Sequence, residues 1–247
     1  GLNSSVQRLE AGQRMVIVSN AAAFAARYPG VAVAGVFQAG TNLSNGGERL
    51  ALLAADGSVV LDFSYGDSSP WPKAADGQGY SLVLIRPETN PDHGVALNWR
   101  ASGGLNGTPG GSDGESFAAW AARTGQPADP AEDADRNGLA GIVEYGLGLT
   151  PSATGAAGVV SARLEPVVVN GVTDNYLVMR VRWSRVADDV VVVPEFSTAL
   201  SGWQALVHET EPRTVLPGGM EEATYRTPVP EALLPRAQVR VSVRSRP

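Results

Sequence analysis

Hydrophobic and polar residues alternate at the end of the chain. Valine occupies every second position of residues 239–243, and arginine or serine fills the positions between. This period of two buries one face of a strand and leaves the other in water. We predict five further strands in β-branched and aromatic runs that turn residues separate, at 161–170, 175–184, 189–197, 203–209 and 222–227. Six short strands of this kind predict a β-sandwich.

The first hundred residues follow a similar pattern of short apolar runs between turn signals. Runs at 14–18, 31–37 and 80–86 predict strands, and an alanine-rich run after Asn20 predicts a short helix that Asn20 caps and Pro29 ends. Two β-type runs, 48–55 and 58–65, flank Asp56 and Gly57, and an Asp-Gly pair in this position is a strong hairpin signal.

Two glycine- or alanine-rich stretches, 103–114 and 151–158, separate these β-rich blocks from a central segment. Apolar residues at helical spacing predict helices at 115–124 and 139–147, with Ser112 and Glu115 forming a capping box at the first. We therefore expect three parts: a β-sandwich at 1–110, a helical connector at 111–150 and a second β-sandwich at 151–247.

The connector contains a twelve-residue motif that is typical of calcium loops. Residues 133–144 match D-x-D-x-[DN]-G-x5-E at every fixed position. A calcium ion takes six to eight hard oxygen ligands, and glycine at the sixth position permits the sharp turn around it. The motif predicts that Ca2+ binds the side chains of Asp133, Asp135, Asn137 and Glu144 and the carbonyl oxygen of Leu139.

The same residues also fit a solvated acidic loop whose Asp-x-Asp and Asn-Gly pairs make turns and cap the next helix. A turn does not require the carboxylate of Glu144 at the twelfth position, which favours the calcium site. The sequence holds no second loop of this type, so we expect a fixed structural ion and not a paired sensor that opens.

Composition narrows the classes of partner. The net charge is -6 and no basic run is present, which argues against nucleic acid. Cysteine is absent, which excludes disulfides and thiolate metal sites. The sequence has no run of about 18 apolar residues, so it predicts no membrane span. Because free calcium is scarce in cytosol, we expect an exported protein, extracellular or at the cell surface, whose signal peptide is not in this chain.

Residues 9–110 resemble the lamin-tail domain. The resemblance rests on ordered short motifs, namely S-N-G-G-E-R-L-A-L-L, D-G-S-V-V-L-D-F-S-Y, P-W-P, G-Y-S-L-V-L-I, N-W-R-A-S and G-T-P-G. It implies an immunoglobulin-like β-sandwich without catalytic activity. The family normally has further strands before the A-G-Q-R-M-V-I-V equivalent. The resemblance therefore implies either a sandwich that is trimmed at its first edge or one that residues outside this chain complete.

The connector and the last block resemble a second arrangement. D-x-D-x-N-G-L followed by E-Y-G-L-G is similar to the calcium-binding linker of large surface proteins of Verrucomicrobia and related bacteria, where a C-terminal β-domain follows it. The resemblance implies an all-β chain of two sandwiches, the first immunoglobulin-like, joined by a helix-loop-helix calcium-binding connector. A dockerin would need a duplicated loop, so cohesin binding is not expected.

No enzyme motif is in its required context. Ser112 lies in a G-x-S-x-G pattern, but a glycine-rich linker cannot hold a strained nucleophile elbow. His93 and His208 lie far apart, and we interpret His93 as a solvated loop residue. The acidic pair Asp188 and Asp189 is interpreted as a turn whose neighbouring side chains point apart. We expect no enzyme, although a hydrolase with an unrecognised carboxylate site remains an alternative.

The predicted function is a non-catalytic, calcium-stabilised structural, adhesion or scaffolding region of an exported bacterial protein. It is expected to be monomeric, with an unidentified protein or polysaccharide of the cell surface as partner. A carbohydrate-binding module is the first alternative, with Trp71, Tyr80 and Trp99 as an aromatic platform. The other interpretation of these three residues is that they fill a core or seal loops.

Overall fold

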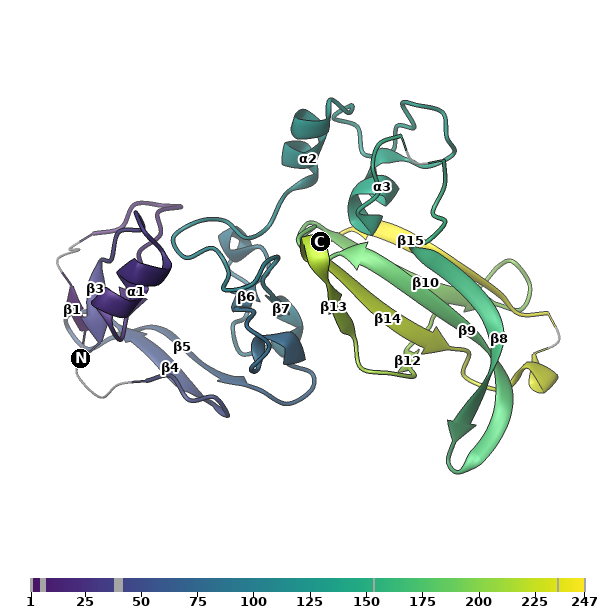
Figure 1. Cartoon of the computed structure of the whole chain (residues 1–247), viewed down its shortest axis with the longest axis horizontal. Coiled ribbons are helices and arrows are strands. Elements are labelled where there is room, and N and C mark those ends of the chain that lie inside the picture. Colours follow the sequence, from purple (N-terminus) through teal and green to yellow (C-terminus); the bar gives the residue numbers. More distant parts are fainter. Residues whose placement is uncertain (1, 5–7, 38–41, 153, 235, 247) are drawn as a thin grey trace. The chain divides into compact units, whose positions relative to one another are not determined.

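The computed structural model describes residues 2–4, 8–37, 42–152, 154–234 and 236–246. The chain divides into two compact units, Gly1–Asp113 and Gly114–Pro247, which we call the N-terminal and C-terminal units. Strands account for 35% of the chain and helices for 16%, in several sheets (Figure 1). The prediction of a mostly β protein is therefore confirmed. The boundary lies before the central helices, which belong to the C-terminal unit.

The N-terminal unit is built from short strands in three small sheets. β3 pairs with β1 antiparallel and with β2 parallel, while β4 pairs with β5 and β6 with β7. The elements are β1 (Leu2–Ser4), β2 (Ile17–Val18), α1 (Ala21–Arg27), β3 (Gly35–Phe37), β4 (Gly47–Leu53), β5 (Val59–Gly66), β6 (Leu82–Leu84) and β7 (Trp99–Ala101), with 3-10 turns at Lys73–Ala75, Pro87–Thr89 and Ala96–Asn98.

The local predictions for this unit are confirmed where a turn or cap determines the structure. Asn20 accepts a hydrogen bond at 3.0 Å from the Ala23 backbone N–H and so caps α1. β4 and β5 form the expected hairpin, in which the Asp56 carboxylate accepts the Ser58 N–H at 2.9 Å. Gly57 has φ 86°, which few residues besides glycine adopt freely. The other predicted strands are present but shorter.

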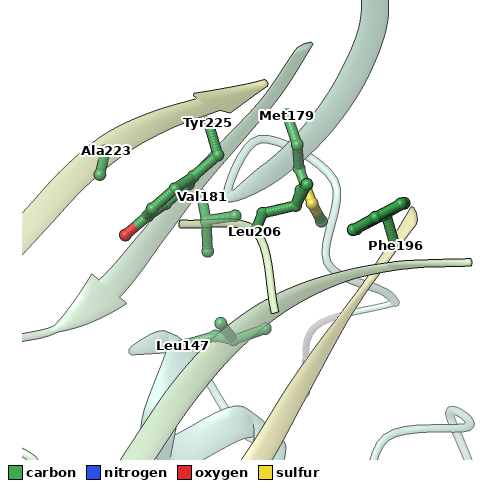
Figure 2. Packing of buried hydrophobic residues seen from close by; sticks show 7 residues of the cluster. All are labelled: Leu147, Met179, Val181, Phe196, Leu206, Ala223 and Tyr225. Carbon is green, nitrogen blue, oxygen red and sulfur yellow. The ribbon is translucent and has the colours of Figure 1, made fainter. Parts of the chain in front are cut away.

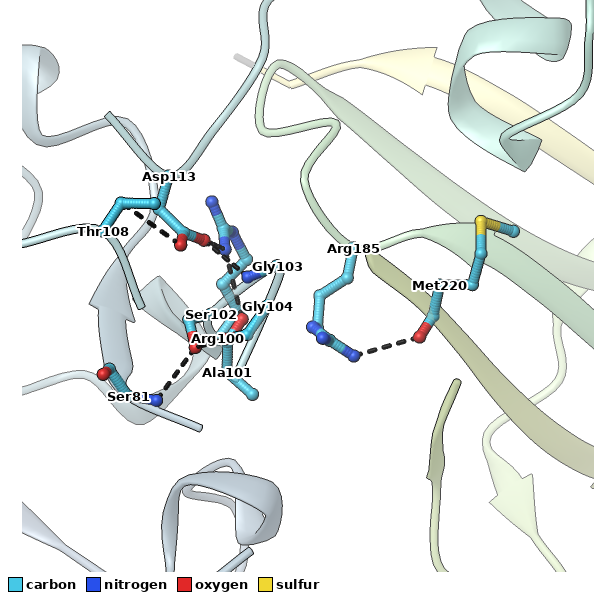
Figure 3. A network of polar contacts seen from close by, with 10 residues as sticks. All are labelled: Ser81, Arg100, Ala101, Ser102, Gly103, Gly104, Thr108, Asp113, Arg185 and Met220. Atoms are coloured by element: carbon cyan, nitrogen blue, oxygen red, sulfur yellow. Dashed lines mark hydrogen bonds and ion pairs between the residues drawn. The ribbon is translucent and has the colours of Figure 1, made fainter. Parts of the chain in front are cut away.

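A buried ion pair ties the end of the N-terminal unit to β7 (Figure 3). Arg100 Nη1 donates to Asp113 Oδ1 at 2.5 Å, and the two side chains are only 7% and 6% exposed. The same oxygen accepts the Gly103 N–H at 2.7 Å. Asp113 therefore neutralises a buried charge and fixes the backbone of the preceding glycine-rich segment.

We predict that Asp113→Ala destabilises the N-terminal unit by about 3–5 kcal/mol, because it leaves the Arg100 charge buried without its carboxylate. Asp62→Ala is the matched control, since it removes an Arg49 ion pair of 2.6 Å between exposed side chains. It should change stability little. Calorimetric unfolding measures both; equal losses in the two variants would contradict the assignment.

The C-terminal unit contains two larger sheets and two helices. One sheet has the order β11-β10-β15, and the other has the order β12-β14-β9-β8 with β13 on β14. These strand pairs are all antiparallel. Their bounds are α2 (Phe117–Thr124), α3 (Gly141–Leu147), β8 (Val160–Val169), β9 (Val172–Ser184), β10 (Val190–Ser197), β11 (Gln204–Ala205), β12 (His208–Glu209), β13 (Thr214–Leu216), β14 (Met220–Arg226) and β15 (Gln238–Ser245), with 3-10 turns at Pro217–Gly219 and Glu231–Leu233.

One hydrophobic cluster joins both sheets and a helix (Figure 2). Its buried members come from α3, both sheets and the segment after β11: Leu147, Met179, Val181, Phe196, Leu206, Ala223 and Tyr225. The three alternating valines of β15 pack against it, which confirms the predicted buried face of that strand. Burial of this apolar surface is the main force that holds the two sheets together.

Helix α3 packs closely on the sheets because it carries glycine at a contact point. A Cβ on Gly146 would lie 2.7 Å from Val243 Cγ1. The predicted helix at 139–147 is confirmed from Gly141, where regular helix begins. The predicted cap Ser112 of the preceding helix is wrong: Ser116 accepts the Ala119 N–H at 3.2 Å and is the N-cap of α2.

Gly146→Ala should destabilise the C-terminal unit relative to Gly141→Ala, a substitution in the same helix. Overpacking costs about 1–3 kcal/mol, which exceeds the helix-propensity gain of about 1 kcal/mol from glycine to alanine. A Cβ on Gly141 meets nothing nearer than 3.4 Å. Urea unfolding compares the two; a Gly146→Ala variant at least as stable as Gly141→Ala would refute close packing of α3.

Candidate metal centre

The acidic loop lies between α2 and α3 in the C-terminal unit, and two of its residues have left-handed backbone conformations. Arg136 has φ 61° and Gly138 has φ 89°. A non-glycine residue in this region costs roughly 1–2 kcal/mol. These two left-handed residues reverse the direction of the loop, so that its first half lies near the start of α3.

Backbone amides of the loop converge on Asp133. The Asn137 N–H donates to Asp133 Oδ1 at 3.1 Å, and the Gly138 N–H donates to Asp133 Oδ2 at 2.9 Å. The Asn137 N–H also lies 3.2 Å from Asp135 Oδ1. The two aspartates therefore hold the turn from inside, and their charges face the same backbone segment.

The Asn137 carboxamide lies between carboxylates from opposite ends of the loop. Its Nδ2 donates to Asp135 Oδ2 at 2.9 Å and to Glu144 Oε1 at 3.1 Å. Its Oδ1 accepts the Leu139 N–H at 2.7 Å. The structure thus brings the four predicted side-chain ligands into one hydrogen-bonded group.

Glu144 is the buried member of this group. It lies in α3 and is only 2% exposed. Burial raises the pKa of its carboxyl group, and the charges of Asp135 and Asp133 raise it further, while the hydrogen bond from Asn137 acts in the opposite direction. A bound cation would favour the ionised form.

The donor set fits calcium in its chemistry, because it offers carboxylate, amide and carbonyl oxygens. Within the described residues, no three acidic, histidine or cysteine side chains form a group that could hold a metal ion as they stand. In this conformation the Asn137 NH2 group, a hydrogen-bond donor, lies against Asp135 and Glu144. Calcium binding would require the oxygen of that amide, and not its NH2 group, to face the ion beside Asp135 and Glu144.

A second set of contacts holds α3, and with it Glu144, in place. The Tyr145 hydroxyl lies between the carbonyl oxygen of Glu115 and Asp189 Oδ1, 2.5 Å from the latter. Asp189 Oδ2 accepts the Phe117 N–H at 2.7 Å at the start of α2. Burial and the Asp189 carboxylate raise the pKa of Tyr145. Asp189 thus joins both helices to the turn between β9 and β10.

Aromatic packing also holds α2 against α3. Phe117, Trp120 and Tyr145 are buried, and their ring centroids lie 5.5 to 5.8 Å apart. The sequence does not predict that Asp189 holds the two helices, because Asp188 and Asp189 have the pattern of a turn. The contact with Phe117 joins positions 72 residues apart, and no local pattern indicates it.

The other candidate residues have structural contacts. The interpretation of His93 as a solvated residue is wrong, because its half-buried ring lies 5.3 Å from Phe63 and 6.0 Å from Trp99. Trp99 Nε1 donates to the His93 carbonyl oxygen at 2.8 Å, which closes that loop. The Trp71 and Trp99 rings are tilted by 44° and do not form a flat platform.

Comparison of the chain with protein-family models, with curated proteins and with solved structures found no match. In the part of the chain that the structure describes, no helix has the length and apolar character needed to cross a membrane.

The raised pKa of Glu144 predicts a pH dependence in the absence of calcium. The folded state binds this proton more tightly than the unfolded state, so the stabilisation exists at low pH and is lost as pH rises through the folded-state pKa. In chelator, the unfolding free energy of the wild type minus that of Glu144→Gln should fall as the pH is raised above about 4.3, the ordinary pKa of a glutamate carboxyl group.

Glu165 provides a control of opposite sign. The hydrogen bond from Arg163 lowers its pKa, so its contribution is present above the unfolded-state pKa and is lost on acidification. The corresponding difference for Glu165→Gln should therefore rise with pH. Chemical denaturation across this range measures both; a flat or rising difference for Glu144→Gln would contradict the assignment.

Proposed function

We propose that the chain is a calcium-stabilised, non-catalytic structural module of an exported protein, with adhesion or scaffolding as its role. The observation that carries this proposal is the convergence of Asp135 and Glu144, from the two ends of the loop, on the Asn137 amide. A turn alone does not need a buried carboxylate seven residues beyond Asn137. Calcium would be held by Asp133, Asp135, Asn137, Glu144 and the Leu139 carbonyl oxygen.

The ion would supply positive charge near the carboxylates of Asp133, Asp135 and Glu144. The chain's own residues would transmit this stabilisation to the rest of the unit. Glu144 belongs to the same short helix as Tyr145 and Leu147, which are buried against α2 and the sheets. Fixing Glu144 therefore fixes α3 on the C-terminal unit. Because the unit boundary lies between Asp113 and Gly114, the ion would stiffen the C-terminal unit from its first helix onward.

The finer fold assignments belong to the same proposal. We infer a β-sandwich in the C-terminal unit, which is supported by residues of both sheets in one hydrophobic cluster. For the N-terminal unit we infer a lamin-tail-like, immunoglobulin-like sandwich. The β4–β5 hairpin and the antiparallel β6–β7 pair support this inference, because they lie in the segments that carry the resemblance.

Calcium should raise the melting temperature of the C-terminal unit. A ligand that binds only the folded state adds about 2.7 kcal/mol at a hundred times its dissociation constant. Asp133→Ala and Glu144→Gln should each remove most of the calcium-dependent increase, because each removes a charged ligand. Scanning calorimetry with calcium and with chelator measures the effect.

Asp174→Ala provides the matched control, since it removes an exposed carboxylate of the same unit outside the loop. It should keep the full calcium response. Equal melting temperatures with and without calcium in the wild type would refute the proposed function, and so would an equal response in all the variants.

A further inference from the structure

The two sheets of the C-terminal unit are joined along one side. β11 and β12 belong to different sheets, and only Leu206 and Val207 lie between them in the chain. Leu206 is buried in the hydrophobic cluster, so the chain crosses from one sheet to the other along this side (Figure 2). β15 and β8 are the edge strands at the other end of each sheet's order. They therefore both lie on the opposite side of the unit.

β15 has a free edge of eight residues. Gln238–Ser245 pairs with β10 along its full length without a bulge. In the described part of the chain no strand pairs with the other side of β15, and no further backbone hydrogen bond reaches it. Alternate residues of an edge strand direct their N–H and C=O groups away from the neighbouring strand. About half of the backbone groups of β15 are therefore available to another strand.

The other edges of these two sheets suit an added strand less well. β11 and β12 have two residues each, and β13 has three. β8 has ten residues, but Pro166 lies within it and has no N–H group to donate. Strand addition is therefore most favourable at β15, which is long and contains no proline.

The inner face of β8 is only partly covered. Cross-strand partners point to the same face of a sheet, and Ala162 is the partner of Met179 in the hydrophobic cluster. Met179 is 1% exposed, whereas Ala162 is exposed. Leu164, on the same face, is 54% exposed, and its partner Leu177 is half-buried. The cover that the β10–β15 sheet gives to β9 therefore does not extend to β8.

The free edge and the uncovered face have one geometric explanation. The β11-β10-β15 sheet has one strand fewer on this side than the sheet against which it packs. Neighbouring strands lie about 4.8 Å apart and packed sheets about 10 Å apart. A strand added to β15 would therefore extend this sheet over β8, and its inward side chains would cover Ala162 and Leu164. We call the free edge of β15 together with these two residues the β15 edge site.

The outward side of the β15 edge site is cationic. Val239 packs against the cluster, so alternation places Arg240 and Arg244 on the face of β15 that points away from it. Both arginines pair with Glu195 of β10, and their side chains are still 47% and 58% exposed. The outward side chains of an added strand would lie beside them, where opposite charges stabilise a cross-strand pair and like charges destabilise it.

A second copy of β15 fits this edge poorly. Antiparallel pairing of two β15 strands about Ser242 would place Arg240 of each copy opposite Arg244 of the other. These like charges oppose the pairing. An added strand with acidic residues at its outward positions avoids this repulsion, so a partner other than a second copy is favoured.

We propose that the β15 edge site binds an extended segment of another protein in which apolar and acidic residues alternate. The segment adds a strand to β15 and turns its apolar side chains toward Ala162 and Leu164. Its acidic side chains lie beside Arg240 and Arg244. Backbone hydrogen bonds supply affinity, and the alternation supplies specificity. This site does not depend on the calcium loop and goes beyond the proposed structural role.

Fluorescence anisotropy of the full chain with labelled peptides of four Val-Glu or four Val-Lys repeats tests the charge and the alternation. The Val-Glu peptide should bind more tightly, although the net charge of -6 attracts the Val-Lys peptide. A block peptide of four valines followed by four glutamates has the same composition and should not bind. No binding of the Val-Glu peptide, or equally tight binding of either other peptide, would overturn the proposal.

Two N-methylated forms of the Val-Glu peptide test the backbone contacts. Valine and glutamate N–H groups point to opposite edges of the added strand, so methylation of one set blocks pairing with β15 and methylation of the other does not. One form should bind like the parent peptide and the other should not bind. Equal affinity of the two forms would overturn strand addition.

Leu164→Glu and Val172→Glu are a matched pair of variants. Both side chains are exposed, at 54% and 60%, and each substitution adds one negative charge. Val172 is the partner of Val169, on the opposite face of the same hairpin. Leu164→Glu should weaken binding of the Val-Glu peptide about tenfold or more, because it places a charge against apolar side chains. Equal affinity of the two variants would contradict the placement.

Amide hydrogen exchange locates the added strand. The bound Val-Glu peptide should slow exchange in β15 and leave exchange in β11 and β12 unchanged. Protection confined to β8, β11 or β12 would overturn the assignment to β15. A dimer that forms without peptide and protects the same β15 amides would overturn it in favour of a second copy.

Discussion

The stability of the central loop depends on how three carboxylates are kept close together. In the described structure the Asn137 carboxamide meets two of them, and backbone amides of Asn137 and Gly138 meet the third, Asp133. Burial raises the pKa of Glu144, and the charges of Asp135 and Asp133 raise it further, although the Asn137 hydrogen bond acts in the opposite direction. A divalent cation would compensate two of the three negative charges, which is the physical basis of the calcium proposal.

The loop matters to the rest of the C-terminal unit because Glu144 and the packing residues share one short helix. Tyr145 reaches Asp189 and the aromatic group, and Gly146 allows close approach to Val243. Because α3 spans only seven residues, a displacement of Glu144 also displaces these contacts. Left-handed Arg136 carries conformational strain that this packing offsets.

The sequence predicted features whose determinants lie close together in the chain. The Asn20 cap, the Asp56–Gly57 hairpin and the alternating valines of β15 each depend on a few neighbouring residues, and the loop places its side chains within twelve positions. Prediction from the sequence failed where contacts between residues far apart in the chain determine the structure. Asp189 binds the start of α2, where Ser116 and not Ser112 is the cap, and the His93 ring packs against Phe63 and Trp99 and is half-buried.

In the calcium-bound form that we propose, an ion takes the position against Asp135 and Glu144 that the Asn137 NH2 group now holds. Anomalous diffraction from crystals grown in calcium would locate this ion. We expect one peak about 2.3–2.6 Å from oxygens of Asp133, Asp135, Asn137, Leu139 and Glu144, with the Asn137 oxygen facing the ion. No peak, with Asn137 Nδ2 still bonded to Asp135 and Glu144, would contradict it.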